Sequence, residues 1–287
     1  FDFENPISSD VLIKSYWEAN NYVITYNANG GVVDQKTQNV SYNNTFTLAT
    51  PIRDGYTFVG WSEKQNALPT DVADIIYDGE SYLPTGNDTT KTLYAVWAPR
   101  TDMSYTVNHY VEKAGSLGEY ELKLTETLND GKVGDLAWAV HKTDGVFKGY
   151  VENLSHSQSV TMAEVKGDGS TVLNLYYNRA KYDLIVKGEN ATTTGTMVEV
   201  PYETEVTITA NPNQGYEFDR WVIEGEEEGS LEYNNFVNEN GRQNQNAIFK
   251  MPADNITLIA KTKLKKYSIT YNLNGGTATG VNPTEYD

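Results

Sequence analysis

The sequence predicts a mainly β protein built from small modules in tandem. The first observation is an internal repeat: Tyr22-Val-Ile-Thr-Tyr-Asn-Ala-Asn-Gly-Gly31 returns as Tyr267-Ser-Ile-Thr-Tyr-Asn-Leu-Asn-Gly-Gly276. Such an echo indicates a repeated structural unit. The second observation is composition, because 21 Tyr, 5 Trp and 23 Gly among 287 residues favour strands and turns over helices. We therefore expect an array of modules and not one large domain.

Each copy of the repeat predicts a strand followed by a tight turn. In the first copy the side chains of Tyr22, Ile24 and Tyr26 alternate with those of Val23 and Thr25, which is the period of a β-strand. The Asn-Gly-Gly that follows is a strong hairpin signal.

A second motif lies at a fixed distance from each opening strand. Gly55-Tyr-Thr-Phe-Val-Gly-Trp61 reappears as Gly215-Tyr-Glu-Phe-Asp-Arg-Trp221, and Tyr22 precedes Trp61 by the same 39 positions that separate Tyr182 from Trp221. Tyr and Phe two residues apart share one face of a strand, and the Trp can close over that face. We expect Trp61 and Trp221 to be buried.

Each module then ends in another β-rich run, and together the motifs divide the chain. The middle module lacks the Asn-Gly-Gly turn, and within it Val133–His141 is predicted as a short helix with Asp135 as its N-cap. The expected divisions are a closing segment of a preceding repeat at 1–20, modules at 21–100, 104–180 and 181–264, and the opening hairpin of a following repeat at 265–287.

These motifs resemble a known family. Residues 22–97 are similar to the internalin-type B-repeat, or Listeria–Bacteroides repeat, which pairs this opening with G-Y-x-F-x-G-W and a closing T-L-Y-A-x-W. Residues 182–262 resemble a divergent B-repeat, and 104–180 resemble mucin-binding-protein (MucBP) repeats. The resemblance implies β-grasp-like modules of bacterial cell-surface or secreted proteins, hence an extracellular location, and it implies no catalytic residues.

Composition excludes several classes of partner and site. Lys and Arg total 22 against 39 Asp and Glu, a net charge of −17, which disfavours nucleic acid and anionic membranes as partners. No apolar run reaches the roughly 20 residues needed to cross a bilayer. Cysteine is absent, so disulfides and thiolate metal sites are excluded. The chain also begins without a recognisable signal peptide, and we expect an internal piece of a longer array that behaves as a monomer.

The search for reactive groups predicts no catalytic, cofactor-binding or metal-binding residues. His109, His141 and His156 have no ligand spacing and are interpreted as half-exposed strand or loop histidines. No nucleophile elbow or phosphate-binding loop is present. We expect a protein that is not an enzyme and that needs no cofactor.

Aromatic residues outside the repeated motifs are the candidate ligand-binding residues. Tyr42, Tyr77, Tyr82 and Tyr233 fall in expected loops, where an exposed ring can stack on a sugar or anchor a protein partner. The leading hypothesis is a spacer and adhesion stalk that contacts a host or neighbouring-cell surface molecule. The alternatives are a module that binds a glycan or a host protein through these rings, and the accessory region of a secreted hydrolase.

Short linkers between modules predict an extended rod. A module of ~80 residues has a width of about 30 Å, so three in line have an overall radius of gyration of about 28 Å. A single compact domain of the same length has about 19 Å. Small-angle X-ray scattering distinguishes the two, and a value near the lower figure would contradict the rod.

Overall fold

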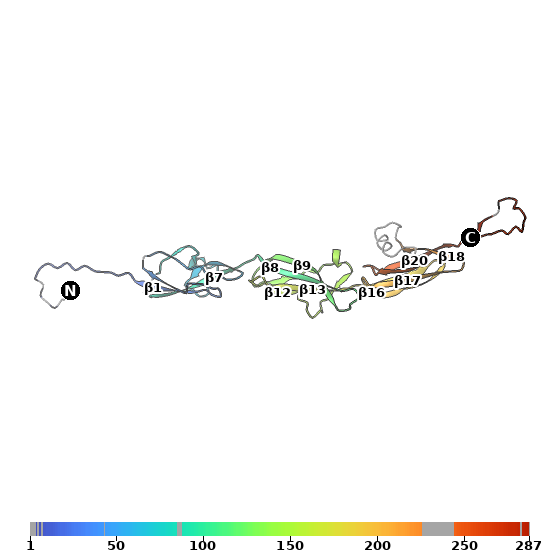
Figure 1. Ribbon diagram of the computed structural model, residues 1–287. Coiled ribbons are helices and arrows are strands. Elements are labelled where there is room, and N and C mark those ends of the chain that lie inside the picture. Colours follow the sequence, from blue (N-terminus) through green and yellow to red (C-terminus); the bar gives the residue numbers. More distant parts are fainter. Residues whose placement is uncertain are drawn as a thin grey trace. The chain divides into compact units, whose positions relative to one another are not determined.

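The computed structural model describes residues 4, 6, 8–42, 44–84, 88–225, 244–281 and 283–286. Regular structure in these residues is almost entirely β, in several small sheets that follow one another along the chain (Figure 1). The described residues form no α-helix and two short 3-10 helices, η1 (Val72–Asp74) and η2 (Gly145–Phe147). The predicted mainly β fold with tandem small modules is therefore confirmed.

The chain divides into two compact units. The first comprises Phe1–Thr106, Thr127–Ala137 and Ala163–Thr171, and the second comprises Val107–Glu126, Trp138–Met162 and Val172–Asp287. Segment 104–180 contributes strands to both units. The domain boundaries expected from the sequence stay predictions.

The first module is a five-stranded mixed sheet in the order β2-β1-β7-β4-β5. Its strands are β1 (Asn21–Asn27), β2 (Thr37–Ser41), β4 (Tyr56–Ser62), β5 (Ile76–Tyr77) and β7 (Thr90–Pro99), with β3 (Phe46–Thr47) and β6 (Ser81–Tyr82) as a separate pair. The first and last strands are adjacent and parallel at the centre, and the other pairs in the sheet are antiparallel. This strand arrangement is β-grasp-like.

The Asn-Gly-Gly motif forms the expected turn inside a longer connection. Asn29 and Gly30 both have positive φ, 49° and 89°, and the Gly31 amide donates to the Ala28 carbonyl at 3.0 Å, as in a type I′ turn. A Cβ on Gly31 would lie 2.7 Å from the Trp97 ring and 2.5 Å from the Ile52 carbonyl oxygen. Gly31 is needed because the closing strand packs directly on the turn.

The motifs of the first module are spaced so that their apolar side chains meet in one hydrophobic core. Tyr22, Ile24 and Tyr26 are buried on one face of β1, and Trp61 is 1 % exposed, with Tyr26 and Phe58 at ring-centroid distances of 4.9 and 5.5 Å. The Trp61 indole N–H donates to the Ala49 carbonyl at 2.8 Å. The predicted burial of Trp61 is confirmed.

The last module repeats this arrangement around Trp221, which is also 1 % exposed and therefore confirms the second prediction. Its main sheet has the order β16-β14-β20-β18, again with the first and last strands parallel, and a second sheet has the order β15-β17-β19. The strands are β14 (Lys181–Gly188), β15 (Ala191–Thr194), β16 (Met197–Pro201), β17 (Glu205–Pro212), β18 (Tyr216–Ile223), β19 (Asn246–Lys250) and β20 (Ile256–Leu264).

The middle segment forms a four-stranded sheet, β11-β13-β8-β9, and a two-stranded ribbon, β10-β12. The strands are β8 (Met103–Glu112), β9 (Tyr120–Gly131), β10 (Leu136–Trp138), β11 (Tyr150–Glu152), β12 (Met162–Glu164) and β13 (Val172–Arg179).

The helix predicted over Val133–His141 is wrong. Gly134 has a φ of 86°, and the Asp135 carbonyl accepts a hydrogen bond from the Val165 amide at 2.9 Å, so the segment pairs as strand β10. Leu136 and Trp138 are exposed while Ala137 is buried, which is the period of a strand. Pairing with a distant segment has overridden the local helical preference.

The two ends differ in regularity. Described residues between 8 and 20 form no strand, and Tyr16 and Trp17 are both 87 % exposed. At the other end β21 (Tyr267–Ser268) pairs with β22 (Glu285–Tyr286), and Asn274 and Gly275 repeat the positive φ of the first turn. The same sequence therefore forms the same turn at both places.

Replacing Trp61 with Ala is expected to destabilise the first module by about 3–5 kcal/mol, because it leaves a cavity in the only core of that module among the described residues. Trp138, which is 60 % exposed, provides the matched control, and Trp138→Ala is expected to stay within about 0.5 kcal/mol of the wild type. Denaturant unfolding of the whole chain measures both values. Equal losses for the two variants would contradict the core assignment.

Candidate functional site

The candidate ligand-binding tyrosines do not form one site. Tyr42 follows β2 and Tyr77 lies in β5, at opposite edges of the same sheet, with 43 % and 37 % of their surface exposed. Tyr82 is buried, and its hydroxyl donates to Glu63 Oε1 at 2.6 Å. Burial and the Glu63 carboxylate raise the pKa of Tyr82 well above its ordinary value. The interpretation of Tyr82 as an exposed loop ring is wrong, and Tyr233 lies outside the described residues.

The interpretation of the histidines holds for two of the three. His141 and His156 are half-buried, but His109 is fully buried in β8. Its neighbours on the same face of the strand are Tyr105, Val107 and Val111, all buried. A histidine in this apolar row needs polar partners for both ring nitrogens.

His109 obtains those partners from β13 and β9. Its Nδ1 lies 2.9 Å from the Tyr177 hydroxyl and its Nε2 lies 2.8 Å from Glu126 Oε2. The Glu126 carboxylate can only accept a hydrogen bond, so Nε2 carries a proton and donates to it. The Tyr177 oxygen also accepts the Lys142 amide at 3.1 Å. Both ring nitrogens of His109 are thus hydrogen-bonded inside the core.

Lys142 places a positive charge beside the Glu126 carboxylate of this cluster. Lys142 Nζ lies 2.7 Å from Glu126 Oε1, and this hydrogen bond, with that from His109, holds the pKa of Glu126 below its usual range. Burial lowers the pKa of the neighbouring His141, whose Nε2 lies 2.6 Å from Glu152 Oε1. His109 and Tyr177 are 0 % and 1 % exposed, so no substrate can reach the ring nitrogens. The cluster ties the strands together.

The opposite face of the same sheet is filled by aromatic rings. Tyr176 is stacked between Tyr110 at 4.9 Å and His156 at 3.7 Å, and Tyr120 meets it edge-on at 5.2 Å. The Tyr176 hydroxyl donates to Gln158 Oε1 at 3.1 Å. These rings cover one another, so this face also packs on its own side chains. Across the described chain, no three His, Asp or Glu side chains are grouped to hold a metal ion.

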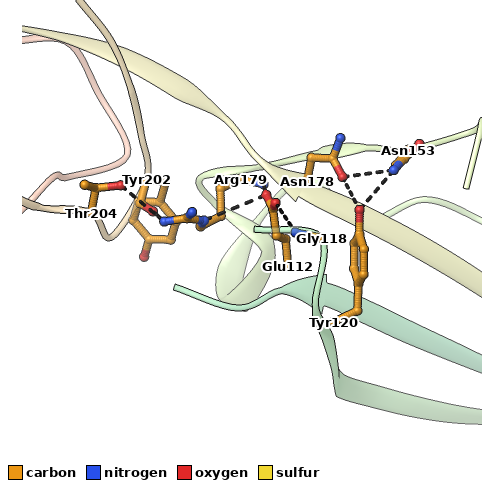
Figure 2. Close-up of polar contacts among 8 residues, drawn as sticks. All are labelled: Glu112, Gly118, Tyr120, Asn153, Asn178, Arg179, Tyr202 and Thr204. Atoms are coloured by element: carbon orange, nitrogen blue, oxygen red, sulfur yellow. Dashed lines mark hydrogen bonds and ion pairs between the residues drawn. The ribbon is translucent and has the colours of Figure 1, made fainter. Parts of the chain in front are cut away.

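The polar contacts with the clearest functional consequence lie where the middle segment meets the last module. Arg179, at the end of β13, directs its Nη1 to the Tyr202 carbonyl and to Thr204 Oγ1, each at 3.2 Å (Figure 2). Its backbone amide donates to Glu112 Oε2 at 3.1 Å, and the Gly118 amide donates to Glu112 Oε1 at 3.2 Å.

Glu112 and Arg179 also form an ion pair, and both of its side chains are buried. The Glu112 and Arg179 side chains are 8 % and 6 % exposed, with Arg179 Nε 3.8 Å from Glu112 Oε2. Removing one member of a buried pair leaves the other as an uncompensated charge, which is strongly destabilising. Arg179 therefore makes the folding of β13 depend on the position of the turn that contains Tyr202 and Thr204.

Backbone contacts and an aromatic ring reinforce the same junction. The Tyr202 amide donates to the Ala180 carbonyl at 2.8 Å, and the Ala180 amide donates to the Gly149 carbonyl at 2.9 Å. Gly149 has a φ of 91°, and a Cβ there would lie 2.7 Å from the Tyr202 ring. Tyr202 also meets Tyr150 edge-on at 5.4 Å, and burial raises the pKa of Tyr150 to about 12.

Sequence reasoning missed this junction, although part of the signal was present. Alternation from Leu173 through Leu175 and Tyr177 places Arg179 on the buried face of its strand. An arginine at a position expected to be apolar indicates a buried partner. Nothing in the spacing names Glu112, Tyr202 or Thr204 as that partner.

Two family models match the chain. Residues 22–96 match the Listeria-Bacteroides repeat domain, and residues 182–265 match the divergent InlB B-repeat domain. Both segments are therefore supported as B-repeats. The resemblance of 104–180 to MucBP repeats stays a prediction.

Two similar curated proteins come from Evansella cellulosilytica. One, named "Putative membrane protein", is 32 % identical over 38 % of this chain and 16 % of its own length. The other, named "Putative Gly-rich membrane protein", is 22 % identical over 97 % of this chain and 30 % of its own length. The chain thus spans less than a third of either relative. No helix formed by the described residues is long and apolar enough to cross a membrane.

A solved structure, "The Bacillus anthracis TIE protein", aligns over 85 % of this chain and 51 % of its own. The sequence identity is 11 % and the TM-score is 0.26. At that TM-score the alignment establishes no common overall fold.

Arg179→Ala is expected to destabilise the second unit by about 3–5 kcal/mol, because Glu112 is left buried without its partner. Thr204→Val, which removes one acceptor of Arg179, is expected to cost about 1–3 kcal/mol. Denaturant unfolding of the single and double variants measures the coupling between the two residues. Hydrogen exchange at the Ala180 and Tyr202 amides should accelerate in both single variants. Additive losses with unchanged exchange would contradict the junction.

Proposed function

We propose, from the two B-repeat segments that this chain carries, that it is a non-catalytic repeat region of a bacterial cell-surface or secreted protein. Its role is that of a spacer and adhesion stalk with an extracellular location. The B-repeat matches support this proposal, and so do the names of the two relatives, which both refer to membrane proteins.

The observation that carries the proposal is the buried Arg179 junction. A spacer must resist bending where one module follows another, and a flexible linker does not. Here Arg179, Ala180 and Gly149 on one side contact Tyr202 and Thr204 on the other through side chains and backbone. Reorientation at this point would break the hydrogen bonds of Arg179 to Tyr202 and Thr204 and remove the packing of Tyr202 on Tyr150.

The polar clusters support a role without catalysis. His109 and Tyr177, the groups best placed to exchange a proton, are enclosed, and the outer face of the same sheet is covered by the Tyr110, Tyr176 and His156 stack. Their contacts serve packing and strand registration. We propose that any reaction of the whole protein takes place outside these modules.

A replacement experiment tests the spacer role in the whole protein. Residues 21–264 are exchanged together for unrelated rigid modules of similar total length, so that no half of the Arg179 junction is left behind, and in a second variant they are deleted. A spacer predicts that attachment of cells to their target surface survives the exchange and falls on deletion. Loss of attachment in both variants would overturn the spacer role and favour direct binding by these modules.

Location is tested separately on intact cells. Brief protease treatment before lysis should release peptides from residues 21–264, which mass spectrometry identifies. Recovery of these peptides only after lysis would contradict the extracellular location. Binding through Tyr42 or Tyr77 would instead appear as saturable glycan or protein binding lost in Tyr42→Ala or Tyr77→Ala.

A further inference from the structure

We propose that the three modules are mechanical clamps in series, in which tension along the chain is carried by the ladder between the first and last strand of each module. This inference rests on the proposed stalk role and adds to it a resistance to pulling force. It follows from the direction of the strands at which the chain enters and leaves each module.

In the first module the chain enters through β1 and leaves through β7. The two strands are parallel neighbours in register over five residue pairs, from Val23–Thr90 to Asn27–Tyr94. The start of β1 and the end of β7 therefore lie at opposite ends of the ladder. Tension applied there slides one strand along the other, so the hydrogen bonds of the ladder are strained together and not one after another.

The last module has the same arrangement. The chain enters through β14 and leaves through β20, which are parallel over five pairs from Leu184–Ile256 to Gly188–Ala260. Both strands are internal to the sheet, since β16 pairs with the outer edge of β14 and β18 pairs with the outer edge of β20. Water cannot easily replace the hydrogen bonds of an internal pair as they are stretched.

In the middle segment β8 and β13 are neighbours in the sheet. Their side-chain partners advance together along both strands, from Asn108 with Asn174 to Tyr110 with Tyr176, which is the pattern of parallel strands. Because the three modules follow one another in one chain, each bears the full tension whatever its orientation to the others.

Side chains of the repeated motifs cross the strained pair in the first module. Asn29, just after β1, donates from Nδ2 to the Ala95 carbonyl of β7 at 3.1 Å. The Trp97 indole N–H donates a hydrogen bond to the Ala28 carbonyl at 2.9 Å. In the last module Thr262 of β20 donates to the Glu189 carbonyl, just after β14, at 2.8 Å. These side-chain hydrogen bonds reinforce the parallel strand pair at the end where the closing strand leaves the module.

Single-molecule pulling on the whole chain tests the clamp. The chain contains no cysteine, so handles can be attached through introduced pairs. Asn20→Cys with Arg100→Cys pulls along the ladder, whereas Asn20→Cys with Thr89→Cys pulls both strands apart from the same end. All three positions are exposed. We expect a severalfold higher unfolding force in the first pair, because five residue pairs share the load. Similar forces in both geometries would overturn the clamp.

Asn29→Ala is expected to lower the unfolding force in the first geometry and leave it unchanged in the second, where Asn29 lies at the far end of the ladder. Thr25→Ala, an exposed position on β1, is the control and should change neither force. An Asn29→Ala variant with wild-type force along the ladder would overturn the role of the motif. Surface exposure of residues 21–264 with equal forces in the two geometries would leave the stalk role intact and reject the clamp alone.

Discussion

The contact between the first and last strands is the constraint on which each B-repeat depends. Because β1 lies beside β7, and β14 beside β20, no module has a complete sheet until its whole sequence has been paired. The parts in between are placed by that contact: β4 and β18 pair with the closing strands, and they bring Trp61 and Trp221 into the two cores. Parallel pairing of distant strands is costly in loop entropy, and the buried Tyr, Ile and Trp side chains offset that cost.

The signature of the repeat can be explained by this contact as well. Gly31 leaves room for the Trp97 ring, because it has no side chain. Asn29 donates a hydrogen bond to the Ala95 carbonyl, and the Trp97 indole donates one to the Ala28 carbonyl. The opening motif and the closing motif are thus two halves of one interface. The last module, which lacks Asn-Gly-Gly, forms an additional strand at that place, β15, and makes the corresponding bond from Thr262.

Sequence patterns predicted what depends on local alternation and on repetition. The strand of Tyr22, Ile24 and Tyr26, the turn at Asn29 and the burial of Trp61 all follow from a short stretch of sequence. Val133–His141 was predicted wrongly because its strand is stabilised by a partner nearly 30 residues away. Tyr82 was misplaced for the same reason, since its position depends on β3 and on Glu63. His109 and Arg179 stood in apolar rows, which indicated buried polar groups, but their partners come from strands and turns that spacing cannot identify.

The docking of Tyr202 on Gly149 has a consequence for how such arrays change in evolution. One side of this contact requires a residue without a side chain, and the other requires a turn that offers a carbonyl and a hydroxyl to Arg179. Neither requirement is visible in the core of its own module. Inserting an unrelated repeat between the two would leave Glu112 and Arg179 without the surface that covers them. The middle segment and the last module must therefore be duplicated or transferred together, and in the same order, if this contact is to be kept.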